Sequence, residues 1–318
     1  MPRHRRKGPI FLGVTLSVLS SLPFAIPQTA KSPATTADSY TLNVAVDEVS
    51  LTFHVADFHG IPMDELKLND LRILDNGKQP RQIVSFEVHQ NLPVRFGILV
   101  DTSRSMLEHL RRNQAIANEY ITQLLHKQSD RAFVMRFDSQ AKVLQDWTED
   151  GAALTASLHN VASDSASRLG GTALFDSIYK ACRDQFGTAN PLAGNFILLF
   201  TDGIDNASHA RLEDDIEICQ KANTAIYIFS VEPKSIFSNG KKTLNGLATQ
   251  TGGVMFFDQS RETIWNDLRI IDVNLRSQYR LVYKPQHFKR DGSFHRIKLD
   301  SPTRDGVITT RSGYYATP

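Results

Sequence analysis

Five side chains that carry oxygen stand in three short segments that the sequence places beside one another. They are Asp101, Ser103, Ser105, Thr172 and Asp202. The first three follow the apolar run 96–100 at alternate positions, and the last follows the apolar run 196–200. Short apolar runs are typical of strands buried on both faces of a parallel sheet. Ligands of such sheets bind at the carboxyl ends of the strands, so the five side chains are predicted to meet at one sheet edge.

Two carboxylates and three hydroxyls make a ligand set of oxygen alone. Oxygen ligands suit a hard divalent cation, so Mg²⁺ is the expected metal, with Mn²⁺ and Ca²⁺ as alternatives. Because few of the ligands are anionic, the ion would stay electron-poor and would attract a carboxylate from outside the chain. The pattern therefore predicts a metal site, with no catalytic residue and no organic cofactor.

The elements that position these loops alternate between strand and helix along residues 93–273. Apolar runs mark buried strands, and segments with apolar residues at helical spacing lie between them. The helical segments are 106–125, 172–186, 211–222, 243–250 and 262–273. Strands that alternate with helices form a doubly wound, mostly parallel sheet covered on both faces, so the fold class is predicted to be α/β.

Both ends of the chain show the period-two alternation of half-buried strands. This pattern covers residues 40–92 and 277–318, and the turn at 75–78 predicts a hairpin within the first segment. Neither segment has enough strands to bury an apolar face alone. We therefore expect the two segments to form one flanking domain that resembles a β-sandwich, with the α/β domain inserted between them.

Residues 1–30 have the layout of a secretory signal peptide. A basic cluster at 3–7 precedes the apolar run 10–22, and small residues follow. An uncleaved membrane anchor is the alternative, although serines and a proline interrupt the run before it reaches the length that spans a bilayer. The linker is placed at 31–39, and the protein is predicted to be exported, whether periplasmic, secreted or at the cell surface. Membrane contact is expected only if the N-terminal segment stays attached.

Cys182 and Cys219 are the only cysteines, and both fall in predicted helices. Export would permit a disulfide between them, whereas two small buried apolar residues are the simpler interpretation. We predict that both thiols are unpaired.

The charge of the chain gives no reason to expect nucleic acid as a partner. Its formal net charge is +2, and residues 1–30 contribute four basic residues and no acid. The remainder is close to neutral, so it lacks the positive surface that binds phosphate backbones or anionic membranes.

The five residues resemble the metal-ion-dependent adhesion site of the von Willebrand factor A (VWA) domain. Asp101, Ser103 and Ser105 fit its Asp-x-Ser-x-Ser motif, and Thr172 and Asp202 fit its later Thr and Asp. The resemblance implies a Rossmann-like fold in which the serines and the threonine contact the metal. It also implies that the aspartates bind the metal directly or through water. One open coordination position of the metal would then accept an Asp or Glu side chain of a partner.

The segments around these residues resemble a group of exported VWA-related proteins of acidobacteria, whose members commonly end in a motif like Gly313-Tyr314-Tyr315. Arg104 departs from the pattern, because family members often have a small residue there. It either biases the site toward an acidic partner or points into solvent.

The expected function is that of an exported, metal-dependent protein-binding module, not of an enzyme and not of a small-molecule receptor. A cell-envelope assembly factor that uses the same site is the first alternative. A Mg²⁺-dependent phosphotransferase or hydrolase is the second, although Asp101 lacks the adjacent acid that such enzymes use. Asp205 and Asn206 either support the site or form a turn, and Asp176 either supports Thr172 or is a solvated helix acid.

Overall fold

The computed structural model describes residues 47–57, 59, 61–63, 65–161, 171–187, 193–231, 240–257, 263, 271–272, 274–303 and 305–316. The predicted signal peptide, the linker, residues 40–46 and most of the helix predicted at 262–273 lie outside this part of the chain. Among the described residues, no helix has the length and apolar character needed to cross a membrane.

A six-stranded sheet forms the centre of the α/β domain. Its order is β6-β5-β4-β7-β8-β9, and every strand except β6 runs parallel to its neighbour. The strands are β4 (Val94–Asp101), β5 (Arg131–Phe137), β6 (Ala141–Thr148), β7 (Gly194–Thr201), β8 (Thr224–Ser230) and β9 (Met255–Phe257). Residues of β4 and β7 are almost wholly buried, as expected for central strands covered on both faces.

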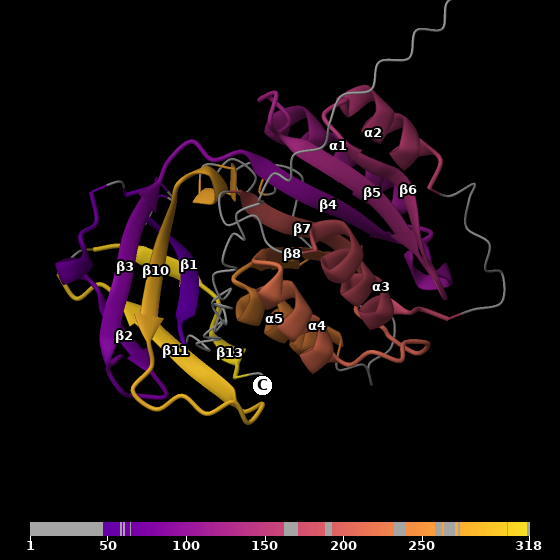
Figure 1. Cartoon of the computed structure of the whole chain (residues 1–318). Coiled ribbons are helices and arrows are strands. Elements are labelled where there is room, and N and C mark those ends of the chain that lie inside the picture. Colours follow the sequence, from indigo (N-terminus) through magenta and orange to yellow (C-terminus); the bar gives the residue numbers. More distant parts are fainter. Residues whose placement is uncertain are drawn as a thin grey trace, which may run out of the picture. The chain divides into compact units, whose positions relative to one another are not determined.

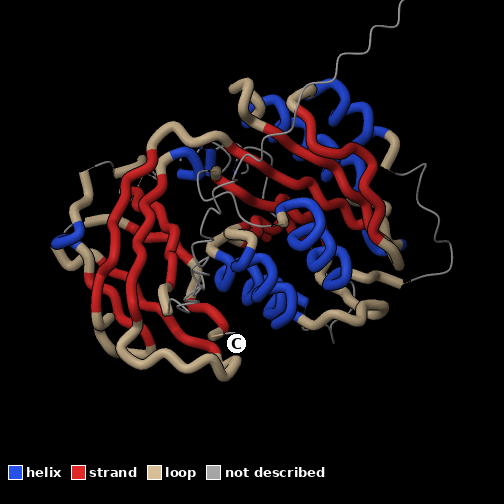
Figure 2. Tube along the Cα trace, viewed as in Figure 1, coloured by secondary structure: helices blue, strands red, loops and turns tan. Residues whose placement is uncertain are grey.

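Helices cover both faces of this sheet (Figures 1 and 2). Helices α1 (Leu110–Leu124) and α2 (Gly151–His159) share one apolar core with the sheet. The opposite core contains α3 (Leu174–Lys180), the π-helical turn η3 (Ala181–Phe186), α4 (Leu212–Lys221) and α5 (Gly240–Thr251). The predicted doubly wound α/β fold is confirmed.

Strands from both ends of the chain form two antiparallel sheets. The first has the order β12-β1-β10-β3 and the second has the order β13-β11-β2. The N-terminal strands are β1 (Val49–Ala56), β2 (Arg72–Asp75) and β3 (Gln82–His89). The C-terminal strands are β10 (Gln278–Lys284), β11 (Phe294–Asp300), β12 (Val307–Thr310) and β13 (Gly313–Tyr315). Leu51, Tyr283 and Ile297 belong to one apolar core between the sheets. The flanking β-sandwich-like unit built from both chain ends is therefore confirmed as part of the fold.

The prediction that the strands on either side of residues 75–78 form a hairpin is wrong. A tight turn is present, with Asn76 at φ 47° and Gly77 at φ 77°, but β2 pairs with β11 whereas β3 pairs with β10. The Asp75 carboxylate accepts hydrogen bonds from Tyr283 (2.9 Å) and Tyr314 (2.8 Å). These bonds anchor the end of β2 in the sandwich core, so the turn leads the chain from one sheet to the other.

The prediction of unpaired thiols is also wrong. Cys182 in η3 and Cys219 in α4 form a disulfide, with their Cα atoms 5.1 Å apart. Both side chains are fully buried in the core beneath α3 and α4. The helical spacing correctly indicated buried positions, but it did not show that the two helices lie side by side with these positions facing each other.

The chain passes between the β unit and the α/β domain at the amino end of β4. Leu92 donates its N–H to the carbonyl of Arg276 (3.0 Å) where the two crossing segments meet. The Arg276 guanidinium forms two 3.0 Å hydrogen bonds with Asp130 and one of 2.8 Å with the Leu124 carbonyl. The β unit thus joins the domain at the sheet edge opposite the carboxyl end of β4, where Asp101 stands.

Candidate metal centre

Asp101 is held rigidly at the carboxyl end of β4. Its side chain is fully buried. The Ser103 N–H donates to Oδ1 (2.9 Å), and the Thr201 hydroxyl donates to Oδ2 (2.7 Å). Because β4 and β7 are parallel neighbours, Thr201 at the end of β7 stands beside Asp101. The two predicted loops therefore meet through a direct side-chain contact.

The segment after Asp101 brings its two serines together. Ser103 is extended, and a 3₁₀ turn, η2 (Arg104–Met106), follows it. The hydroxyl oxygens of Ser103 and Ser105 lie 3.3 Å apart. Met106 is fully buried and anchors the turn, whereas Arg104 is exposed. The alternate spacing thus places both hydroxyls next to each other, close to the carboxylate.

Asp202 follows Thr201 and is 2% exposed. Its Oδ1 accepts the N–H of Ile204 (3.0 Å). The chain turns at Gly203, which has a φ of 79° and where a Cβ would approach Leu244 Cδ1 to 2.7 Å. A larger residue at Gly203 would therefore displace the loop that carries the second carboxylate.

Thr172 is buried, and hydrogen bonds hold its backbone on both sides. Its N–H donates to Asn206 Oδ1 (2.7 Å), and its carbonyl accepts the N–H groups of Asn206 and Ala207. The next residue, Ala173, donates its N–H to the carbonyl of Asp138, directly after β5. The Thr172 segment is thus fastened to the loops that follow β5 and β7. Gly170 lies outside the described residues.

Asp205 and Asp176 also connect neighbouring segments by accepting hydrogen bonds. Asp205 accepts the N–H of Leu174 (2.8 Å) and the hydroxyl of Ser208 (2.6 Å). Asp176 accepts the N–H groups of His209 (2.9 Å) and Ala210 (2.8 Å). Asp205 and Asn206 therefore support the Thr172 segment, as one of the two sequence interpretations proposed, and Asp176 is more than a solvated helix acid.

Electrostatics at Asp101 favour a cation nearby. Burial raises the pKa of Asp101 to about 7, hydrogen bonds from Ser103 and Thr201 oppose this shift, and the charge of Asp202 adds to it. Two buried carboxylates that interact unfavourably fit a divalent ion, which would neutralise both. No cluster of three or more His, Cys, Asp or Glu side chains exists within the described ranges, so hydroxyls must complete any metal shell here.

Sequence reasoning missed Thr201 and Asp138. Thr201 directly precedes Asp202 at the end of an apolar run, so its position could have suggested a role in holding Asp101. Asp138 contributes through its backbone carbonyl, which no side-chain pattern can reveal.

Residues 96–204 match the family model described as the von Willebrand factor type A domain. The predicted resemblance to the VWA domain is therefore confirmed for this part of the chain. The narrower resemblance to an exported acidobacterial group stays a prediction. No curated protein matches the chain.

Several solved structures are similar to parts of the chain. The conserved hypothetical protein BatB of Bacteroides thetaiotaomicron is 17% identical, with a TM-score of 0.46 over 56% of this chain and 97% of that one. A von Willebrand factor type A protein of Catenulispora acidiphila is 15% identical, with a TM-score of 0.45 over 73% of this chain and 72% of that one.

Proximal thread matrix protein 1 of the mussel byssus, with a zinc-occupied MIDAS motif, is also similar. It is 15% identical, with a TM-score of 0.44 over 59% of this chain and 49% of that one. The present chain thus spans about half of that protein. All three TM-scores are below 0.5, so the resemblance to the VWA family rests on the match over residues 96–204.

Proposed function

We propose that the chain is a protein-binding module that holds a divalent cation and uses it to bind an acidic side chain of a partner. The ligands are Asp101, Ser103, Ser105, Thr172 and Asp202, with Mg²⁺ as the expected ion and Mn²⁺ or Ca²⁺ as alternatives. The observation that carries the proposal is the burial of Asp101 and Asp202 at adjoining strand ends beside the paired serine hydroxyls. A bound ion would supply a Lewis-acidic position for a carboxylate.

The chain's own groups pre-organise this site. Thr201 and the Ser103 N–H orient the Asp101 carboxylate, and Asn206 fixes the backbone of Thr172. Loss of supporting hydrogen bonds of this kind typically lowers metal affinity by about 10–100-fold. We propose a binding role and not a catalytic one, because the chain next to Asp101 lacks the second acid that Mg²⁺-dependent phosphotransferases use to hold the ion.

The disulfide between Cys182 and Cys219 supports the proposal that the protein is exported. Disulfides persist in oxidising compartments and are rare where thiols are kept reduced. A periplasmic, secreted or cell-surface location is therefore proposed, with a protein that presents Asp or Glu as the partner.

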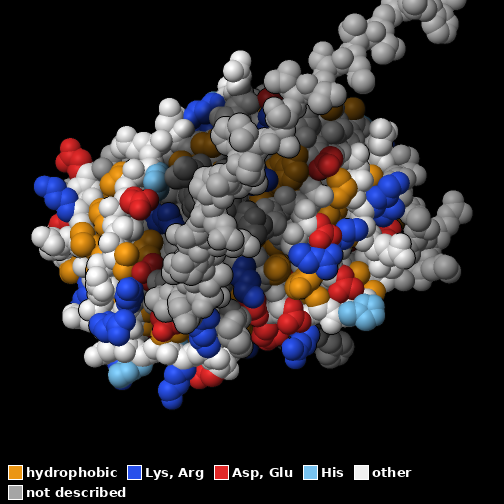
Figure 3. All heavy atoms as spheres, in the orientation of Figure 1, with side chains coloured by type: hydrophobic (Ala, Val, Ile, Leu, Met, Phe, Trp, Pro, Cys, Tyr) orange, Lys and Arg blue, Asp and Glu red, His pale blue; other side chains and the backbone are white. Residues whose placement is uncertain are grey.

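On the face shown in Figure 3, acidic and basic side chains of the described residues are intermixed. They do not form the continuous basic surface that nucleic-acid binding would require. The view thus agrees with a protein partner on the face that it shows.

Calorimetric titration of the full chain with Mg²⁺ and Mn²⁺ tests the metal site. We expect one saturable binding event in the unaltered protein. Asp101→Ala should weaken it by roughly tenfold or more, equivalent to about 1.4 kcal/mol or greater. Asp305→Ala is the matched control, because Asp305 is an exposed acid of the β unit and its loss should leave the affinity unchanged. Equal affinity in Asp101→Ala and the unaltered protein would rule out the proposed ligands.

Capture experiments test the binding role separately. The full chain, immobilised with Mg²⁺, should retain partner proteins that EDTA elutes and that rebind when excess Mg²⁺ is restored. Blocking the carboxyl groups of the captured proteins should prevent rebinding. Retention that is insensitive to EDTA would show that binding does not use the cation.

A further inference from the structure

Arg311, between β12 and β13, is a basic residue that pairs with no carboxylate among the described residues. Its Nη2 donates to the Ser50 carbonyl (2.8 Å), and its guanidinium carbon lies 6.0 Å from the centre of the Tyr314 ring. Its Nε is buried and has no hydrogen-bond acceptor within the described residues. Burial lowers the pKa of Arg311, and the neighbouring Tyr283 and Tyr314 oppose this shift.

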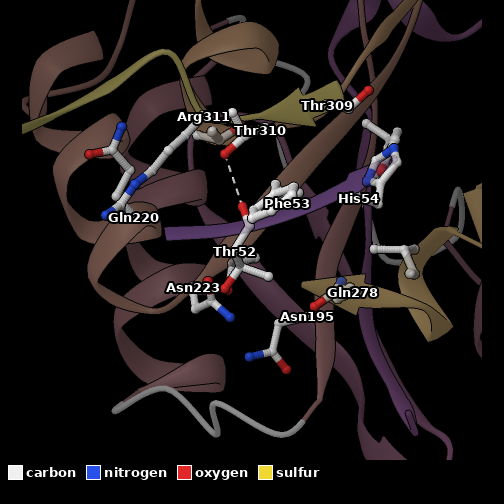
Figure 4. A pocket seen from close by; sticks show the side chains of 16 residues that line it. Thr52, Phe53, His54, Asn195, Gln220, Asn223, Gln278, Thr309, Thr310 and Arg311 are labelled. Carbon is white, nitrogen blue, oxygen red and sulfur yellow. Dashed lines mark hydrogen bonds between the residues drawn. The ribbon is translucent and has the colours of Figure 1, made fainter. Parts of the chain in front are cut away.

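Two cavities meet at Arg311. The smaller, of about 50 Å³, lies between the outer face of β1 and the amino ends of β7 and β8. The larger, of about 390 Å³, lies between α4 and the β unit. Gln220 and Arg311 line both cavities, and Figure 4 shows their side chains next to each other. The guanidinium therefore stands at the boundary of two spaces that a small ligand could enter.

The other charged groups around the larger cavity are already neutralised by ion pairs. Lys221 pairs with Glu217 (2.6 Å), Arg290 with Asp47 (3.2 Å) and Glu48 with Lys284 (3.5 Å). Among the described charged residues that line the larger cavity, Arg311 is thus the one without an ion-pair partner. Arg311 is half-buried, and a charge that is partly removed from water is stabilised by an opposite charge.

A fixed network holds the boundary in place. Gln220 Nε2 donates to the carbonyls of Gln250 (2.8 Å) and Gly313 (2.9 Å), which joins α4 to the end of α5 and to β13. Thr310 donates its hydroxyl to the Thr52 carbonyl (2.9 Å) on the other side of Arg311. The guanidinium therefore sits in a rigid setting, as a binding site requires.

We propose that Arg311 binds a small oxyanion, a carboxylate or a phosphate, at the boundary of these two cavities. Guanidinium groups bind both classes through charge-assisted hydrogen bonds, and Arg311 lines both cavities. The site lies at the amino ends of β7 and β8, at the sheet edge opposite Asp101 and Asp202, so it is independent of the proposed metal function. Because its walls come from both the β unit and the α/β domain, a bound anion would strengthen the contact between them.

Titration of the full chain with inorganic phosphate and, separately, with acetate tests this site and distinguishes the two anion classes. We expect saturable binding of at least one of them, together with a rise in the thermal midpoint. Arg311→Gln should weaken this binding by roughly tenfold or more, because the charge-assisted bonds are lost. Arg290→Gln, which removes a paired arginine from the same cavity, should change the affinity little. Acetate binding alone would assign a carboxylate ligand, and phosphate binding alone a phosphate ligand.

A second measurement on the unaltered protein covers the case in which Arg311→Gln does not fold. The Nε–H proton of Arg311 is shielded from solvent and should give a resolved NMR signal, which should shift saturably as the anion is added. Absence of saturable binding for both anions, or equal binding in Arg311→Gln and the unaltered protein, would overturn the proposal. An Nε–H signal that stays fixed while an anion binds would do the same.

Discussion

At the scale of single residues, the candidate metal centre depends on groups that hold ligands as much as on the ligands themselves. Thr201 links the two loops that carry Asp101 and Asp202: its hydroxyl donates to Asp101 and accepts the N–H of Gly203 (3.1 Å). One side chain thus fixes both the first carboxylate and the turn that presents the second. Such a residue would set the geometry of the proposed metal site without itself contacting the ion.

The raised pKa of Asp101 predicts a specific dependence on pH. Its pKa moves from 3.8 to about 7 in the folded protein, so the folded state binds this proton more tightly than the unfolded state. Without cations, the resulting stabilisation is therefore complete below about pH 4 and is lost as the pH rises to about 7. Metal binding requires the carboxylate, so Mg²⁺ affinity should rise over the same interval.

Urea unfolding in EDTA, compared between the unaltered chain and Asp101→Asn, measures this effect. Asp215 is also buried, and its pKa is raised mainly by that burial. Both proteins retain Asp215, so its effect on stability cancels when the two are compared. The stability difference between the two proteins should change between pH 4 and pH 7. A difference that is constant across this range would show that Asp101 titrates normally.

The sequence indicated which loop carries three of the proposed ligands, but it did not indicate the groups that hold them. Asp101, Ser103 and Ser105 could be placed in one loop because alternate residues after a strand turn the same way, and the serine hydroxyls do lie together. The hydrogen bond from Thr172 to Asn206 spans 34 positions and depends on how loops fold over the sheet edge. Spacing along the chain carries no information on such a contact.

At the scale of elements, the disulfide joins η3 to α4 on one face of the sheet. The two helical segments belong to different βα units, and the bond closes a loop with a sequence separation of 37. Helical periodicity predicted that each cysteine is buried, but periodicity describes one helix at a time. The neighbour that a buried position contacts is decided by how helices are ordered on the sheet.

Removing this disulfide should reduce the stability of the α/β domain. In the chain-entropy account, a loop of this length contributes about 4 kcal/mol, and measured losses fall at roughly 2–5 kcal/mol. Urea unfolding of Cys182→Ala/Cys219→Ala should therefore show a lower midpoint than the unaltered protein under oxidising conditions. The matched control is the unaltered protein in reductant, which should approach the double variant. An intact mass of the unreduced chain equal to that of the dithiol form would show that the bond does not form.

At the scale of the whole chain, strands from both ends are interleaved in the β unit. β10 lies between β1 and β3 in one sheet, and β11 lies between β13 and β2 in the other. Alternating apolar residues predicted that each segment needs a second apolar face, and this reasoning led to the correct pairing of the chain ends. The hairpin was wrong because a turn signal fixes the turn but not the sheet in which each flanking strand lies.

This interleaving predicts that the N-terminal strands cannot stay ordered without the C-terminal ones. Each of β1, β2 and β3 pairs only with C-terminal strands in the described structure. Deleting residues 277–318 removes all these pairings and half of the sandwich core, which includes Tyr279, Leu281 and Tyr283. Residues 47–89 should then be cleaved rapidly by protease. The VWA domain should stay folded, because the truncation retains Arg276 and its bonds to Asp130, and it should still bind Mg²⁺ if the site is as proposed.

Limited proteolysis with mass spectrometry of the fragments, run beside the full chain, gives the answer. Protection of residues 47–89 in the truncated chain would mean that the N-terminal strands fold against the VWA domain alone, and that the inserted arrangement of the domains is wrong.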